Sequence, residues 1–282
     1  MDANGHKIYV KIRVYLCLFV VTFILYLGNL KLANMTKRQF KRYCDIVYNE
    51  SGIHLTEEKW QLLNARIGKR IRKLGVQPDK YLSIIEKDPD ELNTFLDAIS
   101  TNHTYFFRES KSFKYLDKGC RDIWCAASSS GEEPYSLLTY CMELGFEPSI
   151  LATDISDSCL ERARRAIYPK KCLSNIPNHM IKRYFQKGMG KWEDHVRIKQ
   201  HFSRMVKFEK FNLLKDSPPL KTFDIIFCRN VMIYFDIPTK EAIIHKLSKV
   251  LKQGGYFIIG GAESLSGLTH SLKYIEPSVY KK

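Results

Sequence analysis

The sequence lacks the features that would place it among collagen-like, low-complexity or multi-span membrane proteins. Of its 282 residues, 45% are hydrophobic and 27% are charged, which is ordinary for a globular protein. No internal repeat is visible. This length is sufficient for one large domain or two modest ones with a substantial buried core.

The cysteines form no C-x-x-C pair, and the histidines show no spacing typical of metal ligands. We therefore expect neither a disulfide framework nor a metal site, and we interpret the cysteines as reduced thiols of a cytoplasmic protein. The eight cysteines are Cys17, Cys44, Cys120, Cys125, Cys141, Cys159, Cys172 and Cys228.

Acidic residues are scarce, since 30 Asp and Glu stand against 45 Lys and Arg, which gives a formal charge of +15. Such an excess favours an anionic partner, whether a nucleic acid, an acidic membrane surface or an acidic protein. Thirteen basic and three acidic residues lie between Glu161 and Lys207. Six basic residues and no acid lie between Lys59 and Lys73.

One long apolar run, residues 14–28, follows Lys7, Lys11 and Arg13. Its fifteen residues are fewer than the roughly 20 that a membrane-spanning helix needs. We interpret residues 1–34 as an extension that either precedes a functional start at Met35 or serves as an N-terminal anchor.

Residues 35–100 are predicted to form a helical domain. Thr36 is a candidate cap for a helix that ends near Asn49, Thr56 precedes a second helix, and Pro89 begins a third. In the second helix, apolar residues at helical spacing predict one buried stripe, which comprises Trp60, Leu63, Ile67, Ile71 and Leu74.

A different face of this second helix carries Arg66, Lys69 and Lys73. No acid is interleaved to form helical ion pairs with them. The face is therefore either an ordinary solvated surface or a docking surface for an acidic partner.

After residue 100, short apolar runs alternate with helical patterns, which is typical of a parallel sheet covered by helices on both faces. In an open sheet of this kind, the ligand lies beyond the carboxyl ends of the strands. The residues that follow each strand are therefore candidate site residues. The predicted strands are 122–127, 150–153, 206–211, 223–228 and 256–260, and the predicted helices are 133–144, 158–166 and 238–251.

Small residues, from Ala126 to Gly131, follow the first predicted strand and open a helix. Small side chains let a ligand approach the backbone closely, but the loop is not G-x-G-x-x-G. Glu132 and Glu133 at the helix start would repel a pyrophosphate. A dinucleotide is therefore disfavoured, and the two carboxylates suit a cationic ligand group.

Polar residues follow the other strands. Asp154 ends the second strand, where an acid either binds ribose hydroxyls or caps the next helix. Asn212–Leu213 follow the third strand, and Arg229–Asn230 follow the fourth. S-adenosylmethionine combines a ribose, a base and positive groups, and Arg108 is a candidate partner for its carboxylate.

Six blocks of this sequence resemble the bacterial chemotaxis receptor glutamate O-methyltransferases, in the family's order and between Met35 and Tyr280. The resemblance implies a doubly wound, mostly parallel α/β domain at 101–282, with a small antiparallel β-subdomain inserted at about 168–206, after a helical domain at 35–100. It also implies methyl transfer from S-adenosylmethionine to glutamate side chains of chemotaxis receptors. The blocks are ESGIHLTEEK (50–59), TNHTYFFRE (101–109), SSSGEEPYSLL (128–138), ATDIS (152–156), FCRNVMIYFD (227–236) and GGYFIIGGAESL (254–265).

The resemblance also implies which residues act. Of the two adjacent glutamates we favour Glu133, and we place Arg108 and Tyr234 beside the transferred methyl, although Tyr234 also suits an ordinary core position. In some members the β-subdomain binds the receptor's C-terminal tail, and the basic face of Arg66, Lys69 and Lys73 is a docking candidate. The implied cofactor-binding residues are Asn102, Thr104, Arg108, Glu132, Glu133, Asp154, Asn212, Leu213, Arg229 and Asn230.

Two other functions compete with this interpretation. Nucleic-acid methyltransferases commonly place [D/N]-P-P-[F/Y] after the fourth strand, where this chain has Asn-Val-Met-Ile at 230–233. A non-catalytic S-adenosylmethionine-sensing adaptor would be expected to lose Arg108, Asp154 or Arg229, and all three are present. We therefore expect a cytoplasmic, monomeric enzyme that binds no nucleic acid and is recruited to membrane-bound receptors.

Overall fold

The computed structural model describes residues 35–100 and 102–282, so the interpretation of residues 1–34 lies outside the described residues. Within the described ranges, no helix has the length and apolar character needed to cross a membrane. The described residues group into two compact units, one of residues 35–43 and 56–89 and the other of residues 44–55 and 90–282.

The N-terminal region is helical, as the sequence predicts. Thr36 and Gln39 form a reciprocal cap at its first helix: the Gln39 backbone N–H donates to Thr36 Oγ1 (3.3 Å) and the Thr36 N–H donates to Gln39 Oε1 (2.7 Å). The elements are α2 (Lys37–Ser51), η1 (Glu57–Lys59), α3 (Trp60–Leu74), α4 (Pro78–Ile85) and α5 (Pro89–Ile99).

The predicted apolar stripe of α3 is buried along most of its length. Leu63, Ile67 and Ile71 are buried, whereas Leu74, the last residue of the helix, is 38% exposed. Gly75 ends the helix in the left-handed conformation (φ 66°), which turns the chain away. Helix α4 was missing from the sequence analysis, because it has only eight residues and begins at a proline.

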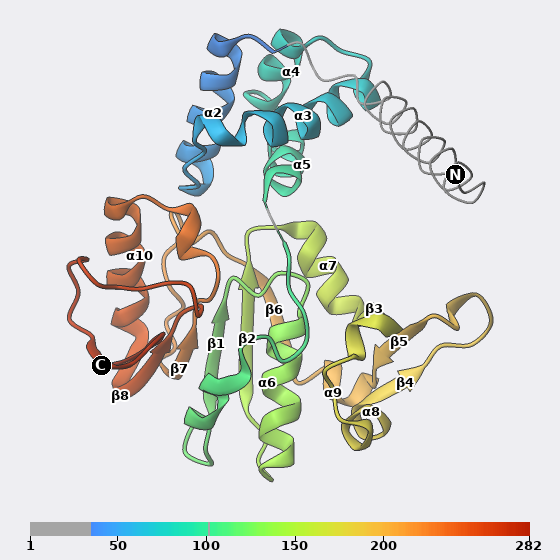
Figure 1. Cartoon of the computed structure of the whole chain (residues 1–282), viewed down its shortest axis with the longest axis vertical. Helices are drawn as coiled ribbons and strands as arrows, with labels where there is room; N and C mark the ends of the chain where they lie inside the picture. Colours follow the sequence, from blue (N-terminus) through green and yellow to red (C-terminus); the bar gives the residue numbers. More distant parts are fainter. Residues whose placement is uncertain (1–34, 101) are drawn as a thin grey trace, which may run out of the picture. The chain divides into compact units, whose positions relative to one another are not determined.

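The second unit contains a seven-stranded sheet with the order β6-β2-β1-β7-β8-β10-β9. Figure 1 labels β6, β2, β1, β7 and β8 of this sheet. Strands β6, β2, β1, β7 and β8 are parallel to one another, as predicted. Strands β10 and β9 add an antiparallel edge beside β8, which was not predicted from the sequence. The elements are β1 (Asp122–Ala126), α6 (Glu132–Glu143), β2 (Ser149–Asp154), α7 (Asp157–Arg165), β6 (Val206–Lys210), β7 (Phe223–Phe227), α10 (Ile237–Val250), β8 (Leu251–Ile258), β9 (Lys273–Glu276) and β10 (Val279–Lys281).

Helices cover both faces of this sheet. Alternate side chains of each strand point to opposite faces, so each strand contributes to two cores. Ile123 and Cys125 of β1 belong to a core that includes residues of α6 and α7. Trp124 and Ala126 belong to a second core that includes residues of α10. In Figure 1 the strands stand between α10 on one side and α6 and α7 on the other. The predicted two-sided cover is confirmed.

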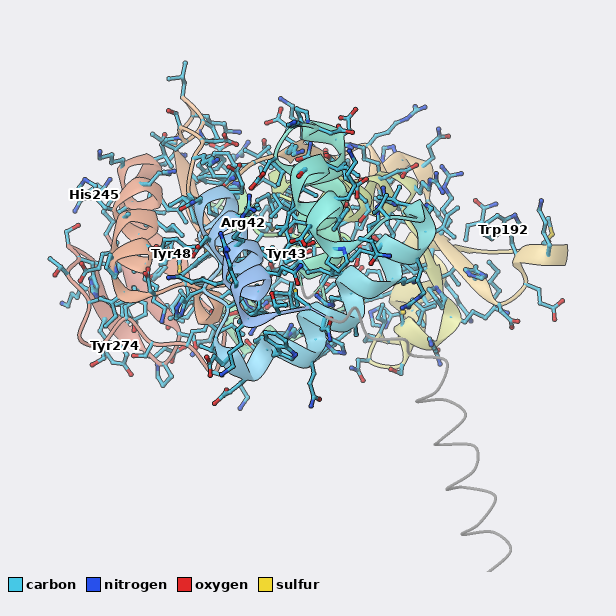
Figure 2. The ribbon with its side chains drawn as sticks, turned by 90° about the horizontal axis from the view of Figure 1, so that it is seen from above. Arg42, Tyr43, Tyr48, Trp192, His245 and Tyr274 are labelled. Carbon is cyan, nitrogen blue, oxygen red and sulfur yellow. The ribbon has the colours of Figure 1, made fainter. Side chains whose placement is uncertain are left out.

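The chain between α7 and β6 forms the inserted subdomain, a three-stranded antiparallel sheet with the order β3-β5-β4. Most of the basic stretch 161–207 belongs to it. Figure 2 shows Trp192 on the long connection between β4 and β5, where its side chain is 46% exposed. Its elements are β3 (Ile167–Pro169), η3 (Lys170–Leu173), α8 (Asn178–Tyr184), β4 (Phe185–Lys187), η4 (Gly190–Trp192), β5 (His195–Ile198) and α9 (Gln200–Ser203).

Candidate active site

The strand order places the candidate residues in one row. From β1 the chain moves outward to β2 and β6 and then returns to β7 on the other side of β1. A ligand binds at the carboxyl ends of the strands where the order reverses in this way. Adjacent strands are about 4.8 Å apart, so the ends of β6, β2, β1 and β7 span about 14 Å, which suits an extended nucleoside with a tail.

The loop after β1 has a backbone that side chains rarely adopt. Ala127 (φ 118°), Ser129 (φ 47°) and Gly131 (φ 93°) all have positive φ. A Cβ on Gly131 would lie 2.8 Å from the Ala163 Cβ of α7, so only glycine lets α7 approach the start of α6 this closely. The shape of the loop is therefore fixed by packing.

Asp154 fixes this loop through its carboxylate. Its Oδ2 accepts the Ser129 backbone N–H (2.7 Å) and its Oδ1 accepts the Ser156 N–H (3.0 Å). Burial raises the pKa of Asp154, although these hydrogen bonds oppose the shift. The cap of α7 is Ser156, whose Oγ accepts the Cys159 N–H, so the alternative of Asp154 as the helix cap is wrong. The Ile155 backbone N–H also interacts with this carboxylate, so only part of its roughly four lone-pair positions remains for ligand hydroxyls.

Arg229, directly after β7, connects three segments of the chain. Its Nη1 donates to Glu133 Oε1 (2.5 Å), and its Nη2 donates to the Arg108 carbonyl (2.7 Å) and to Glu109 Oε2 (3.1 Å). The Arg229 side chain is 3% exposed. Burial raises the pKa of Glu133, and the charge of Arg229 partly offsets this. This guanidinium is therefore a fixed part of the site.

Glu132 and Glu133 face different surroundings. Glu132 is buried, accepts a hydrogen bond from Ser130 Oγ (2.7 Å) and lies 3.6 Å from an Arg162 nitrogen. Burial raises its pKa, whereas the Ser130 hydrogen bond lowers it. Of these two glutamates, only Glu133 contacts Arg229, and its role in cofactor binding stays a prediction.

Asn230 has a left-handed backbone (φ 58°) and is held from two sides. Its backbone N–H donates to Glu263 Oε2 (2.9 Å), and its Nδ2 donates to Glu109 Oε1 (3.3 Å). Glu263 also accepts the Gly260 N–H (2.6 Å), so it joins the chain after β7 to the chain after β8.

The segment before β1 carries three predicted residues. Arg108 Nη1 donates to the His103 carbonyl (2.8 Å), which leaves other N–H groups of the guanidinium for an anion. The Asn102 carbonyl accepts Ser129 Oγ (3.5 Å), so this segment lies against the loop after β1. Thr104 is half-buried.

Asn212 and Tyr234 are held by residues 50–54, which belong to the same compact unit. Asn212 Nδ2 donates to the Glu50 carbonyl (2.7 Å), and its Oδ1 accepts the Leu214 N–H (2.9 Å). The Tyr234 carbonyl accepts the His54 N–H (2.7 Å). The side chain of Tyr234 is half-buried. Leu213, the predicted residue that follows Asn212, is buried.

Two buried polar atoms at this edge fit a polar ligand. Ser128 Oγ and Arg229 Nε have no hydrogen-bond partner among the described residues. Together with the remaining lone pairs of Asp154, they suit a nucleoside with an amino-acid tail. No group of three or more His, Cys, Asp or Glu within 35–100 and 102–282 is arranged to hold a metal ion.

Glu109 and Glu263, two acids that hold the polar loops together, were not predicted from the sequence. An available signal for Glu109 was its place directly after Arg108. Glu263 follows Gly260–Gly261 at the end of β8, another strand end whose residues were not singled out.

Comparison with known proteins adds a family match over both units. A family model described as CheR methyltransferase, SAM binding domain, matches residues 102–281, and one described as CheR methyltransferase, all-alpha domain, matches residues 38–100. A chemotaxis protein methyltransferase of Borreliella burgdorferi is 38% identical and covers 88% of this chain and 95% of its own length. The corresponding protein of Salmonella typhimurium is 36% identical (88% and 93%), and chemotaxis protein methyltransferase 2 of Pseudomonas aeruginosa is 35% identical (87% and 93%).

Proposed function

This chain belongs to the CheR methyltransferase family, and from that membership we propose that it methylates glutamate side chains of chemotaxis receptors. The methyl donor is S-adenosylmethionine, and the products are glutamate methyl esters. The observation that carries the proposal is the match to both family domains together with the polar row at the strand ends.

The residues of the row divide between the parts of the cofactor. Asp154, held by the backbone N–H groups of Ser129 and Ser156 among others, binds the ribose hydroxyls. Arg108 pairs with the carboxylate of the amino-acid tail, and the Arg229–Glu133 pair orients the tail's ammonium group. Asn212 and Leu213 contact the base, while Asn102 and Thr104 line the segment beside the loop after β1.

The reaction depends on aligning the acceptor carboxylate with the methyl group more than on general acid–base catalysis. When bound, S-adenosylmethionine supplies a methyl group on a sulfonium. The acceptor glutamate has an ordinary pKa near 4.3, so its carboxylate is already ionised at neutral pH and needs no base. An oxygen of this carboxylate forms the new O–CH₃ bond, the S–CH₃ bond breaks with its electron pair on sulfur, and no proton moves. Arg108 and Tyr234 exclude water and align the acceptor beside the methyl.

The partner is an acidic receptor surface. The charged face of α3, defined by Arg66, Lys69 and Lys73, and the basic inserted subdomain serve as docking surfaces. Lys69 and Lys73 are exposed and Arg66 is half-buried. We place the protein in the cytoplasm, as a monomer recruited to membrane-bound receptors.

The test is a methylation assay with the full chain, radiolabelled S-adenosylmethionine and membranes that contain receptors. We expect label in receptor bands that mild alkali releases as methanol, and loss of this label with Arg108→Ala. Label that resists alkali, or no label, would show that the protein is not a carboxyl methyltransferase. Calorimetry of Arg108→Ala should show no cofactor binding, and unchanged affinity would refute the role of Arg108.

A further inference from the structure

Glu109, which no part of the proposed mechanism uses, contacts four polar residues at one end of the row. Its Oε2 accepts the Gly261 N–H (2.7 Å) and Arg229 Nη2 (3.1 Å). Its Oε1 accepts Asn230 Nδ2 (3.3 Å) and lies 3.7 Å from Arg108 Nε. One carboxylate therefore joins the segment before β1 to the chain after β7 and the chain after β8.

The local conformation of Glu109 is unfavourable by itself. Its φ of 48° lies in the left-handed region, which non-glycine residues adopt rarely and at a cost. The Gly261 and Asn230 hydrogen bonds and the Arg229 ion pair offset that cost. Burial alone would raise the pKa of Glu109, but the Gly261 N–H and the Arg229 charge lower it, so the carboxylate is ionised at neutral pH.

The position of Glu109 separates it from the nucleoside end of the site. Asp154 is the last residue of β2, whereas Glu109 contacts residues that follow β7 and β8, on the other side of β1. A nucleoside whose ribose lies at Asp154 directs its amino-acid tail toward Arg108 and Arg229. Glu109 touches both of these arginines.

We propose that Glu109 is a positioning residue that holds Arg108, Arg229 and Asn230 for the amino-acid tail of the cofactor. This inference rests on the proposed function only for the identity of the cofactor. Glu109 acts through its neighbours: its loss removes the carboxylate beside Arg108 Nε, while the Arg108 bond to the His103 carbonyl stays, and it leaves Arg229 with one carboxylate partner, Glu133.

Glu109→Gln is the most specific variant, because it keeps the shape of the side chain and removes its negative charge. Both carboxylate oxygens face N–H donors, so the amide nitrogen of glutamine would face a donor in either orientation. Hydrogen bonds to charged groups contribute enough that losing one changes an affinity by about tenfold to hundredfold.

The experiment measures the affinity of the full chain for two ligands by calorimetry. S-adenosylhomocysteine carries the amino-acid tail, and 5′-methylthioadenosine has the same nucleoside without it. We expect Glu109→Gln to weaken S-adenosylhomocysteine about tenfold to hundredfold and to leave 5′-methylthioadenosine within about twofold of the unaltered chain. Asp154→Asn should weaken both ligands. Glu161→Gln, an exposed glutamate paired with Arg165 on α7, is the matched control and should change neither.

The outcomes separate this inference from the proposed function. Equal weakening of both ligands, or a lower melting temperature with no ligand selectivity, would show a general structural role and overturn the inference. Unchanged affinity for S-adenosylhomocysteine would overturn it as well. If Glu109→Gln shows the selective pattern but the unaltered chain methylates no receptor, the proposed acceptor is wrong and the role of Glu109 stands.

Discussion

At the residue scale, the site combines rare backbone conformations with hydrogen bonds that fix them. Glu109, Ala127, Ser129 and Asn230 all have positive φ. Each such residue costs on the order of 1–3 kcal/mol and persists only where its surroundings determine it. The Asp154–Ser129 and Glu109–Asn230 hydrogen bonds hold Ser129, Glu109 and Asn230 in these conformations. The polar groups are thus held in place before a ligand binds, which lowers the entropy cost of binding.

Gly260 offers a direct test of this packing. A Cβ there would lie 2.4 Å from Asn230 Nδ2 and 2.8 Å from Glu263 Oε2, so Gly260→Ala must displace Asn230. We expect a loss of about 1–3 kcal/mol in the free energy of unfolding, measured with urea, and a weaker affinity for S-adenosylhomocysteine. Gly261→Ala is the graded comparison, because its Cβ would meet Glu109 at 3.3 Å and the effect should be smaller. An equal effect of the two variants would contradict this assignment.

Asp154 predicts a dependence of cofactor binding on pH. Burial, with a contribution from the charge of Asp97, raises its pKa above the ordinary value, so it takes up a proton at a higher pH than an ordinary aspartate. The protonated acid has fewer acceptors for ribose hydroxyls. Affinity for S-adenosylhomocysteine should therefore fall as pH drops through the raised pKa, by about tenfold per pH unit below it. Calorimetry across this range should show a flat profile for Asp154→Asn, and the same slope in both proteins would refute the prediction.

At the element scale, the C-terminal half of α2 belongs to the unit of residues 44–55 and 90–282. The family match assigns the same residues to the all-alpha domain, which spans residues 38–100. The Tyr48 hydroxyl donates to Asp236 Oδ2 (2.8 Å), at the cap of α10. The His54 N–H donates to the Tyr234 carbonyl, and the Glu50 carbonyl accepts Asn212 Nδ2. Residues 44–55 therefore hold two strand-end loops that carry predicted site residues.

Gly52 lies where residues 44–55 contact α10. Its φ of 75° disfavours any side chain, and a Cβ would lie 3.0 Å from Thr239 Cγ2 of α10. We expect Gly52→Ala to lower the free energy of unfolding by about 1–2 kcal/mol and to reduce methylation. Tyr48→Phe removes one hydrogen bond and should cost about 1 kcal/mol. Gly75→Ala is the control: it has a similar φ of 66° with open space around it, and only the conformational cost should remain.

At the scale of the whole molecule, the charge of +15 is concentrated in two regions, residues 59–73 and 161–207, which we propose as receptor-docking surfaces. Electrostatic docking of this kind weakens with added salt, because mobile ions screen exposed charges beyond about 8–10 Å at physiological ionic strength.

Charge reversal tests the first of these surfaces. Changing Arg66, Lys69 and Lys73 to glutamate should raise the KM for receptor at least about tenfold, since like charges then oppose an acidic partner. Calorimetric affinity for S-adenosylhomocysteine should stay unchanged. The effect should shrink as salt is added.

The matched control for charge reversal changes three exposed lysines to glutamate in the unit that does not contain α3. They are Lys118, Lys249 and Lys273. This variant has the same net charge, and we expect its KM for receptor to remain near that of the unaltered chain. A similar increase of KM in both variants would mean that net charge, not the α3 face, governs the association.

Local patterns were enough to predict most of the fold. The alternation of apolar runs and helical patterns predicted the five parallel strands and the helices α6, α7 and α10, because burial on both faces leaves a clear signal in sequence. Helix α4 and strands β9 and β10 were missed, since three to eight residues carry little periodicity. Strand β8 begins at Leu251, five residues before its apolar pattern, and its register with β7 shifts between Phe223 and Ile225.

Apolar runs that must be buried identify the residues at the strand ends from the sequence alone. Asp154, Arg229 and Asn230 were found in this way. The contacts of these groups are visible only in the folded chain: Glu133 and not Glu132 pairs with Arg229, and Glu109 joins three loops. Local patterns carry no such signal because the partners are distant in sequence: Glu109 and Arg229 are 120 residues apart and meet because the strand order reverses between β1 and β7.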